Sequence, residues 1–533
     1  MAPPMGTGSG SGSAEAPRDS CDAGSLWRSY VGPVDDLERA LLSPFPTMFL
    51  LPCSALALFL LTCLALEPPP RHPSPSNPAF CRFQREFLLG YLPALAADWL
   101  QGPLLFQLLQ SRGFLRSQIA ALYSCGFASN VAFGLVSSVF VDRLGRKKSC
   151  VLSSGLCSVS CLLQLSQDFL ALAAGRVLAG LGTSLLFSAF ESWYIHEHLE
   201  RHDFPAEWIP NTFSRVALWN SGLAVAAGLV AELVAEGLAL GPVAPFLVAM
   251  PFLALSGIFA GKNWDENYGK SRSCSKACGE GLRGLLSDPR TLLLGLVQAL
   301  VESILLIFAF LWTPVLEPHG IPLGIAFSGF TAASAAGSAL FRRGVTGRLR
   351  LQPVRLLPGS ILLLALALLL LALPLPLPLY LPGDFLALLM LQLSCGIYFP
   401  AMAFLRRRLE HGRDAAGGAR WLRLPLGLGV SLALPALPGD PAGTRRVFGA
   451  AALAALVALG AAGGILGTAR GDEGLRRQWS RRTLPAFPGR LRLSPSSRSD
   501  WLRELSVPAP RVAIGPTGTV GGRRETDADG TRM

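Results

Sequence analysis

Charged residues are scarce in this chain, and their scarcity excludes an ordinary soluble domain. Only 15% of the 533 residues are Asp, Glu, Lys or Arg, whereas a typical soluble protein has about 25%. The mean hydropathy is +0.43, and 51% of the residues are hydrophobic. The composition therefore indicates a protein whose long segments lie in lipid rather than in water.

The sequence also lacks the short motifs of the common enzyme and ATP-driven classes. It contains no Walker A pattern, no dinucleotide-binding fingerprint and no nucleophile elbow. The histidine-rich stretch His196–Asp203 is not an HExxH motif, because Glu200 stands where the second His is needed. We predict that the chain is not an enzyme, has no cofactor and binds no metal, and we interpret His196–Asp203 as a solvated loop.

The cysteine and basic residues indicate neither a disulfide-stabilised protein nor a nucleic-acid-binding protein. The 11 cysteines are an odd number, and most lie inside apolar runs, so the sequence predicts no disulfide framework. The net charge is +12, but Lys and Arg gather in short loops beside the apolar runs. This is the cytoplasmic bias of a membrane protein, so we predict the lipid bilayer as surroundings and no nucleic-acid partner.

Long apolar runs fill the chain between residues 48 and 467. A helix needs about 20 residues to cross the hydrocarbon core, and only helices can satisfy their own backbone hydrogen bonds there. We predict an all-α polytopic membrane protein with one helix over 48–66 and twelve more. The twelve are expected near 84–110, 118–141, 149–166, 170–194, 211–236, 240–260, 291–315, 322–341, 356–376, 384–404, 421–438 and 446–468.

The twelve helices fall into two sets of six around a long basic loop. Two such halves, related by an axis along the membrane normal, leave a central cavity that can open to either side. Whether the count is 12 or 13, which side holds the N-terminus, and whether translation starts at Met1 or Met48 stay open. The predicted segments are a disordered extension (1–47), an N-terminal transmembrane helix (48–66), an N-terminal half (84–260), a cytoplasmic linker (261–290), a C-terminal half (291–468) and a disordered basic tail (469–533).

The turn after the second of these twelve helices carries the most specific motif. An Asp at the helix end can pair with an Arg across the half, and a Gly permits a tight turn. We therefore predict a gating latch that holds the inward face shut. The alternative is a basic anchor that only keeps the loop in the cytoplasm. The latch residues are Asp142, Arg143, Gly145, Arg146 and Lys147.

Four ionisable residues inside the predicted helices are candidates for substrate contact or proton coupling: Asp98, Arg176, Glu191 and Glu302. Ionisable groups in spanning helices are functional by default, and desolvation favours the protonated form of a carboxyl. Glu191 and a fifth residue, Glu232, lie near helix ends, where interfacial water is the alternative. Arg176 opens an Arg-x-x-x-Gly-x-Gly pattern; its alternative role is a structural arginine bonded to nearby carbonyls.

The latch turn and the Arg-x-x-x-Gly-x-Gly pattern resemble the major facilitator superfamily. Longer stretches resemble one branch of it, the animal molybdate-anion transporters, and the resemblance runs from about residue 48 to about residue 467. It implies two six-helix halves and a plasma-membrane protein that mediates cellular uptake of molybdate. The stretches are Ala96–Gln101, Phe187–His198, Glu200–Pro210, Gly241–Phe246, Phe310–Leu316 and Phe404–Arg407.

The implied substrate conflicts with the charges of the predicted helices. A tetrahedral dianion calls for cations and hydrogen-bond donors, yet most intramembrane charges are acidic and Arg176 is the main cation. Either the acids serve proton symport, or the substrate is not an anion. The expected function is secondary active transport of molybdate, with an organic-solute transporter or a non-transporting receptor or scaffold as alternatives. The oligomeric state stays open.

Overall fold

Helices make up the regular structure of the described residues. The computed structural model describes residues 77–269, 289–346, 351–373, 383–409 and 418–471, with residues 279, 283 and 286. Four predictions lie wholly or mostly outside these residues: the extension at 1–47, the helix at 48–66, most of the linker at 261–290 and the tail at 469–533. The described residues all belong to one compact unit.

Six long helices and several short ones form the N-terminal half. The long helices are α3 (Pro78–Leu100), α5 (Arg116–Leu144), α6 (Arg146–Leu163), α7 (Phe169–His196), α8 (Ile209–Glu232) and α9 (Ala244–Asn263). The short ones are α4 (Leu105–Ser111), the π-helices η1 (Glu197–Arg201) and η3 (Leu233–Gly237), and the 3-10 turn η2 (Ala206–Trp208).

The first of the twelve predicted helices, 84–110, is split and begins earlier than expected. Asn77 caps α3 by accepting a hydrogen bond from the Ala79 N–H at 2.9 Å, and Pro78 suits the first helical position. The helix ends at Leu100, just before Gly102 and Pro103. Proline removes a donor and disfavours helix at the residue before it, so the chain restarts as α4.

Six further long helices form the C-terminal half, and all six overlap the predicted spans. Three of them begin at a proline, the residue best suited to the first helical position. They are α11 (Pro289–Leu316), α12 (Leu323–Thr346), α13 (Pro353–Ala372), α14 (Gly383–Leu409), α15 (Gly418–Ala433) and α16 (Pro441–Gly471), with the short turns η4 (Glu317–His319) and η6 (Leu434–Ala436).

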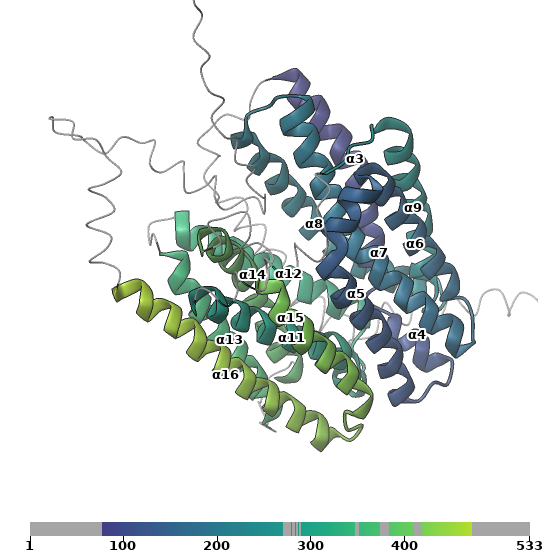
Figure 1. Ribbon diagram of the computed structural model, residues 1–533. Helices are drawn as coiled ribbons and strands as arrows, with labels where there is room; N and C mark the ends of the chain where they lie inside the picture. The colour runs from purple at the N-terminus through teal and green to yellow at the C-terminus, as the bar shows by residue number, and fades with distance from the viewer. Residues whose placement is uncertain are drawn as a thin grey trace, which may run out of the picture. The chain divides into compact units, whose positions relative to one another are not determined.

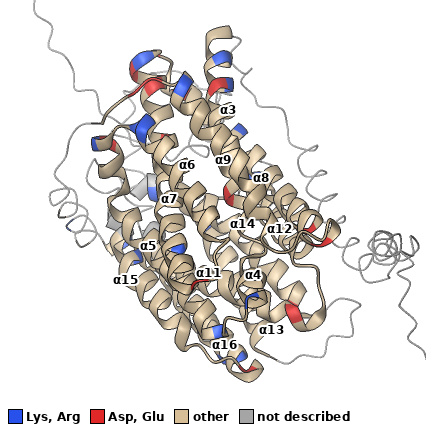
Figure 2. Ribbon diagram, turned by 90° about the vertical axis from the view of Figure 1, so that its right-hand side faces the viewer, with Lys and Arg blue, Asp and Glu red and all other residues tan. Residues whose placement is uncertain are grey.

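Nine of the described helices are long and apolar enough to cross a membrane, by length and composition. The exceptions among the twelve long helices are α6, which begins with three basic residues, α3, which carries Arg82, Arg85 and Glu86 in its first ten residues, and α15, which is shorter. Figure 2 shows most Lys, Arg, Asp and Glu residues toward the two ends of the helices, with long uncharged stretches between. This distribution is that of a bundle that spans a bilayer.

The two halves meet through equivalent helices. The second helix of the N-terminal half, α5, packs on the fifth of the C-terminal half, α15, and the fifth, α8, packs on the second, α12. Figure 1 shows α3–α9 and α11–α16 as two groups of helices. The reciprocal pairing indicates two halves related by a pseudo-two-fold axis, as expected for the major facilitator fold.

Hydrogen bonds join the halves near one end of the bundle. We call the end with the Arg143–Lys148 turn the basic end, and the other the opposite end. Toward the opposite end, Glu232 of α8 accepts a hydrogen bond from the Gly324 N–H at 2.8 Å. Arg116 donates to the carbonyl of Gly439 at 2.7 Å. The structure is thus closed at its opposite end.

Candidate transport site

Two of the predicted site residues, Asp98 and Arg176, are brought together by three helices. Asp98 of α3 accepts a hydrogen bond from the Thr183 hydroxyl of α7 at 3.1 Å. Arg176, earlier on α7, interacts electrostatically with Asp98. The guanidinium carbon of Arg176 lies 5.8 Å from the ring centre of Tyr123 on α5. Both charged side chains are half-buried, so one cation and one carboxyl group share the interior of the N-terminal half.

The guanidinium of Arg176 has no hydrogen-bond partner in the part of the chain that the structure describes, and its Nε is buried. Gly126 of α5 leaves room for it, because a Cβ there would lie 3.1 Å from the guanidinium nitrogen Nη2. In the described part of the chain, Arg176 therefore does not have the alternative role of a structural arginine that is hydrogen-bonded to nearby carbonyls. An arginine in a membrane interior is costly unless it is paired or faces water, so Arg176 is suited to receive an anion.

Small residues allow this close approach of α5 and α7. A Cβ added at Gly180 of α7 would overlap the Ser129 hydroxyl and the Gly126 carbonyl of α5. The Ser129 hydroxyl also donates to the carbonyl of Val177 at 3.1 Å. The Arg-x-x-x-Gly-x-Gly pattern thus sets the helix crossing that carries Arg176.

Glu302 lies in a different cluster, in the C-terminal half. It accepts a hydrogen bond from the Gln298 amide at 2.7 Å and pairs with the Nε of Arg423 on α15 at 2.5 Å. Arg406 of α14 donates to the carbonyl oxygen of the same Gln298 side chain at 2.6 Å. We call Gln298, Glu302, Arg406 and Arg423 the C-terminal charge cluster. Sequence reasoning missed Arg406 and Arg423 because they border a stretch that reads as a basic loop.

The other two acids have separate surroundings. Glu191 of α7 is half-buried and interacts electrostatically with Tyr91 of α3. Glu232, predicted to lie near a helix end, does end α8, but it accepts the hydrogen bond from Gly324 that joins the halves. Only a contact with a distant segment reveals this role, so no local pattern could have predicted it.

The latch residues form a tight local turn. Gly145 has φ +105°, a conformation that favours glycine, as predicted. Asp142 pairs with Arg146 four residues later, at 2.8 Å, rather than with an arginine elsewhere in the half. The side chain of Arg143 is exposed, and Lys147 enters the turn through its backbone N–H, which donates to Glu266 at 2.9 Å.

A segment directly after α9, Trp264–Gly269, fastens this turn to the rest of the half, and we call it the clasp. Its Glu266 accepts hydrogen bonds from the backbone N–H groups of Lys147 and Lys148, at 2.9 and 3.1 Å, so a carboxylate caps the positive N-terminal end of α6. Trp264 stacks on Trp193 of α7 with the ring centres 3.9 Å apart. The clasp was predicted as the start of the linker, yet it packs with the N-terminal half.

The interpretation of His196–Asp203 as a solvated loop is wrong for its first part. His196 ends α7, and the π-helix η1 continues from it. Glu197 and His198 are only 4% and 0% exposed. Glu197 accepts a hydrogen bond from Asn267 of the clasp at 2.8 Å, and a ring nitrogen of His198 lies 2.9 Å from the Pro205 carbonyl. These hydrogen bonds make the burial of Glu197 and His198 possible. His202 is exposed, as predicted.

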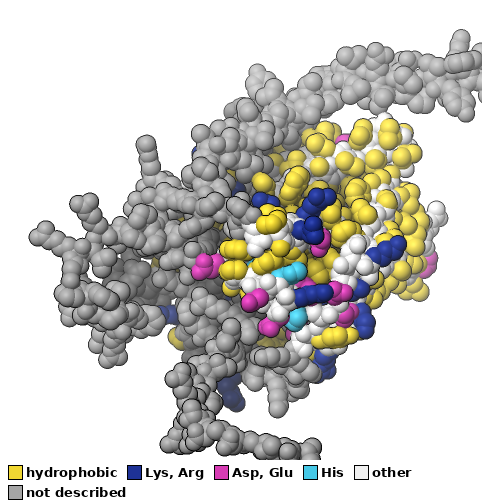
Figure 3. Space-filling model, turned by 90° about the horizontal axis from the view of Figure 1, so that it is seen from above, with side chains coloured by type: hydrophobic (Ala, Val, Ile, Leu, Met, Phe, Trp, Pro, Cys, Tyr) yellow, Lys and Arg dark blue, Asp and Glu magenta, His cyan; other side chains and the backbone are white. Residues whose placement is uncertain are grey.

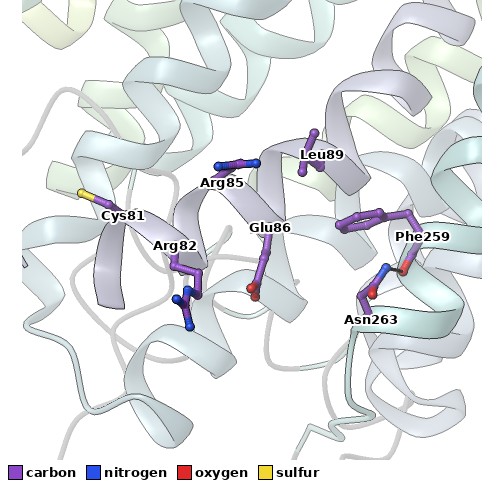
Figure 4. Close-up of a pocket in the computed structure, with 7 residues that line it drawn as sticks. All are labelled: Cys81, Arg82, Arg85, Glu86, Leu89, Phe259 and Asn263. Carbon is purple, nitrogen blue, oxygen red and sulfur yellow. Dashed lines mark hydrogen bonds between the residues drawn. The ribbon is translucent and has the colours of Figure 1, made fainter. Parts of the chain in front are cut away.

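Charged and histidine side chains gather on the surface of the basic end, flanked by hydrophobic ones (Figure 3). A surface pocket at this end lies between α3 and α9, and the charged side chains of Arg82, Arg85 and Glu86 lie to the left of Leu89 and Phe259 in Figure 4. The arrangement is typical of the boundary between lipid and water. No predicted site residue lines the pocket. Its described lining residues are Cys81, Arg82, Arg85, Glu86, Leu89, Phe259 and Asn263.

Replacing Glu266 with alanine should destabilise the N-terminal half. The change removes a helix cap, which costs about 1 kcal/mol and up to about 2 kcal/mol. The free energy of unfolding of the purified protein in detergent measures the loss. Glu200→Ala is the control, because Glu200 is exposed in the neighbouring π-helix. An equal loss in both variants would show that the clasp does not hold the α6 terminus.

The comparisons with known proteins agree with this fold. The model of a family described as sugar transporters with 12 transmembrane helices matches residues 48–395. The molybdate-anion transporter of Xenopus laevis is 49% identical over 433 residues, covering 79% of this chain and 96% of that protein. The one of Takifugu rubripes is 45% identical over 479 residues, covering 81% of this chain and 99% of that protein.

Two solved structures share the fold at low sequence identity. A variant of the nucleoside transporter NupG has a TM-score of 0.58 and 14% identity, covering 72% of this chain and 99% of that chain. A bacterial homologue of the human lysosomal transporter Spinster, in an inward-facing conformation, has a TM-score of 0.55 and 16% identity, covering 73% and 97%. The predicted fold is confirmed, and the chain belongs to the major facilitator superfamily, in the same family as the molybdate-anion transporters of frogs and fish.

Proposed function

We propose that this chain is a secondary active transporter that mediates cellular uptake of molybdate across the plasma membrane by alternating access. The observation that carries the proposal is the 49% identity to a molybdate-anion transporter along 96% of that protein's length. The match extends over 433 residues, 79% of this chain, so it is not confined to one half.

The geometry of the N-terminal half suits an anion. Arg176 offers a half-buried guanidinium without a hydrogen-bond partner in the described chain, and Asp98 lies within its electrostatic range. Charge-assisted hydrogen bonds from guanidinium to oxyanions are among the strong ones in proteins. In the proposal, Arg176 contacts molybdate, while Asp98 is a candidate proton carrier beside it.

Proton coupling would offset the membrane potential. Moving charge against a membrane potential costs about 2.3 kcal/mol per elementary charge per 100 mV. A dianion that enters a cell with a negative interior carries two such charges, so its entry costs twice this free energy. Two protons carried in the same direction cancel this charge. Asp98, Glu191 and Glu302 are the candidate carriers, and Glu302 already has a partner in Arg423.

The latch completes the cycle in this proposal. Contacts such as that of Glu232 with Gly324 close the opposite end, and the positive charge of the basic end supports a cytoplasmic position for it. This corresponds to a state that opens inward. Closure of the basic end would bring the Asp142–Arg146 turn against the other half.

A second candidate is transport of an organic solute, favoured by the family description as sugar transporters. The half-buried carboxyl groups of Asp98 and Glu191 would then accept hydrogen bonds from substrate hydroxyls. A third candidate, a receptor or scaffold that keeps the fold without transport, predicts no flux of any labelled solute.

Uptake of radiolabelled molybdate into cells that express the chain, with and without an imposed pH gradient, tests the proposal. We expect saturable uptake, and a fall of about tenfold in Asp142→Asn, which weakens one charged contact worth about 1.5–3 kcal/mol. Asp203→Asn is the control, because Asp203 is exposed with φ +49°, which Asn tolerates.

Two results would contradict the proposal. One is the absence of molybdate uptake above background while the protein is at the cell surface. The other is saturable uptake of a labelled sugar or nucleoside that molybdate does not inhibit, which would support the organic-solute candidate.

A further inference from the structure

The C-terminal charge cluster has unequal charge and unequal burial. It holds two guanidinium groups, Arg406 and Arg423, but only one carboxylate, Glu302. The side chain of Arg423 is 44% exposed, whereas that of Glu302 is 19% exposed. The carboxylate therefore lies inside the bundle, and its arginine partner reaches toward accessible space.

Two donors of this region have no acceptor in the described structure. The Nε of Arg406 and the hydroxyl of Tyr398 are buried without a hydrogen-bond partner. Tyr398 lies on α14 within electrostatic range of Glu302, Arg406 and Arg423. Buried donors are almost always satisfied in folded proteins, so a ligand that supplies acceptor oxygens would complete the cluster.

The arrangement identifies the chemistry of such a ligand. Two guanidinium groups and a phenol are all donors here, and only Glu302 supplies negative charge to them. A tetrahedral oxyanion carries several acceptor oxygens and can bond two arginines at once. Sugars and other neutral solutes would leave the excess positive charge uncompensated.

We propose that Arg406 and Arg423 form a second oxyanion contact in the C-terminal half, and that Glu302 occupies it as an internal counter-anion when no substrate is bound. The inference rests on the proposed function and deepens it. The incoming oxyanion displaces the Glu302 carboxylate from Arg423 and accepts from Arg406 and Tyr398. Arg406 lies near the end of α14 and Arg423 near the start of α15, so the contact lies toward the basic end.

Binding of molybdate to the purified full-length protein in detergent, measured by calorimetry, tests the inference. Glu302→Gln should bind about tenfold more tightly than the wild type, because a neutral amide does not compete with the oxyanion for Arg423. Arg423→Gln should bind about tenfold more weakly, and Arg423→Lys should fall between it and the wild type.

Arg355→Gln is the matched control, since Arg355 is exposed near the start of α13 in the same half. If the wild type binds molybdate and both Glu302→Gln and Arg423→Gln behave like Arg355→Gln, the second contact is overturned while the proposed function stands. If the wild type binds no molybdate, the proposed function fails. If Arg423→Gln does not fold, the affinity of Glu302→Gln for molybdate tests the second contact alone, because glutamine keeps the shape of the glutamate side chain.

Discussion

Gly228→Val is expected to reduce molybdate uptake about tenfold or more by holding the two halves apart at the opposite end. Gly228 of α8 faces α12 so closely that a Cβ there would overlap the Gly324 carbonyl and the Ser328 hydroxyl. The same crossing carries a hydrogen bond from the Ser328 hydroxyl to the Val225 carbonyl at 2.8 Å. Since backbone atoms cannot turn aside as side chains do, the helices have to separate.

The expected magnitude follows from the cost of overpacking. Extra methyl groups in a packed interior cost about 1–3 kcal/mol, and each 1.4 kcal/mol is about a tenfold change in an equilibrium constant. The population closed at the opposite end should thus fall about tenfold or more relative to the state open there. A transporter that cannot close this end does not complete its cycle, so uptake should fall by at least as much.

The conformational shift can be measured directly. Asn220 of α8 accepts a hydrogen bond from the indole of Trp99 at 2.8 Å, and a cysteine in place of Asn220 reports access from outside. Asn220→Cys combined with Gly228→Val should react faster with an impermeant thiol reagent on intact cells than Asn220→Cys alone. Gly228→Val without the added cysteine gives the background from native thiols.

Gly222→Val is the matched control for this experiment. Gly222 lies on the same helix, but a Cβ there would meet nothing within 4 Å. It should transport like the wild type. If Gly228→Val transports as well as Gly222→Val, the contact between α8 and α12 does not limit closure of the opposite end. The role of this contact as the outer gate would then be contradicted.

The sequence predicted features that depend on neighbouring residues. Apolar length located the twelve long helices, and Gly145 was rightly expected to turn tightly. The early start of α3 also has a local cause, the cap by Asn77. That signal was present in the sequence but was outweighed by the charges at the start of the helix, which a hydropathy pattern counts as loop.

Features that depend on distant partners could not be predicted in the same way. Glu232 was placed near a helix end, yet only the fold shows that it bonds Gly324 of the other half. Glu197 looked solvated because its partner, Asn267, lies 70 residues later. Arg423 was expected at the start of the helix at 421–438, where an arginine beside an apolar run is typical, and nothing nearby identifies Glu302 as its partner.

Arg176→Gln should reduce molybdate uptake about tenfold to a hundredfold at low substrate concentration. One to two charge-assisted hydrogen bonds to the oxyanion would be lost, each worth about 1.5–3 kcal/mol in contacts of this kind. Arg176→Lys should lose less, because lysine keeps the charge but not the planar set of donors. Uptake at several molybdate concentrations, corrected for the amount of protein at the cell surface, provides the measurement.

The thermal stability of Arg176→Gln distinguishes a role of Arg176 in anion contact from a structural role. In the described chain the guanidinium of Arg176 makes no hydrogen bond, and a poorly paired charge in a membrane interior is costly. Arg176→Gln should therefore melt no lower than Arg82→Gln, a control at an exposed position of α3. Loss of uptake with undiminished stability would mean that the arginine is kept for what it binds. Unchanged uptake, or loss of uptake only together with unfolding, would assign the anion contact to other residues.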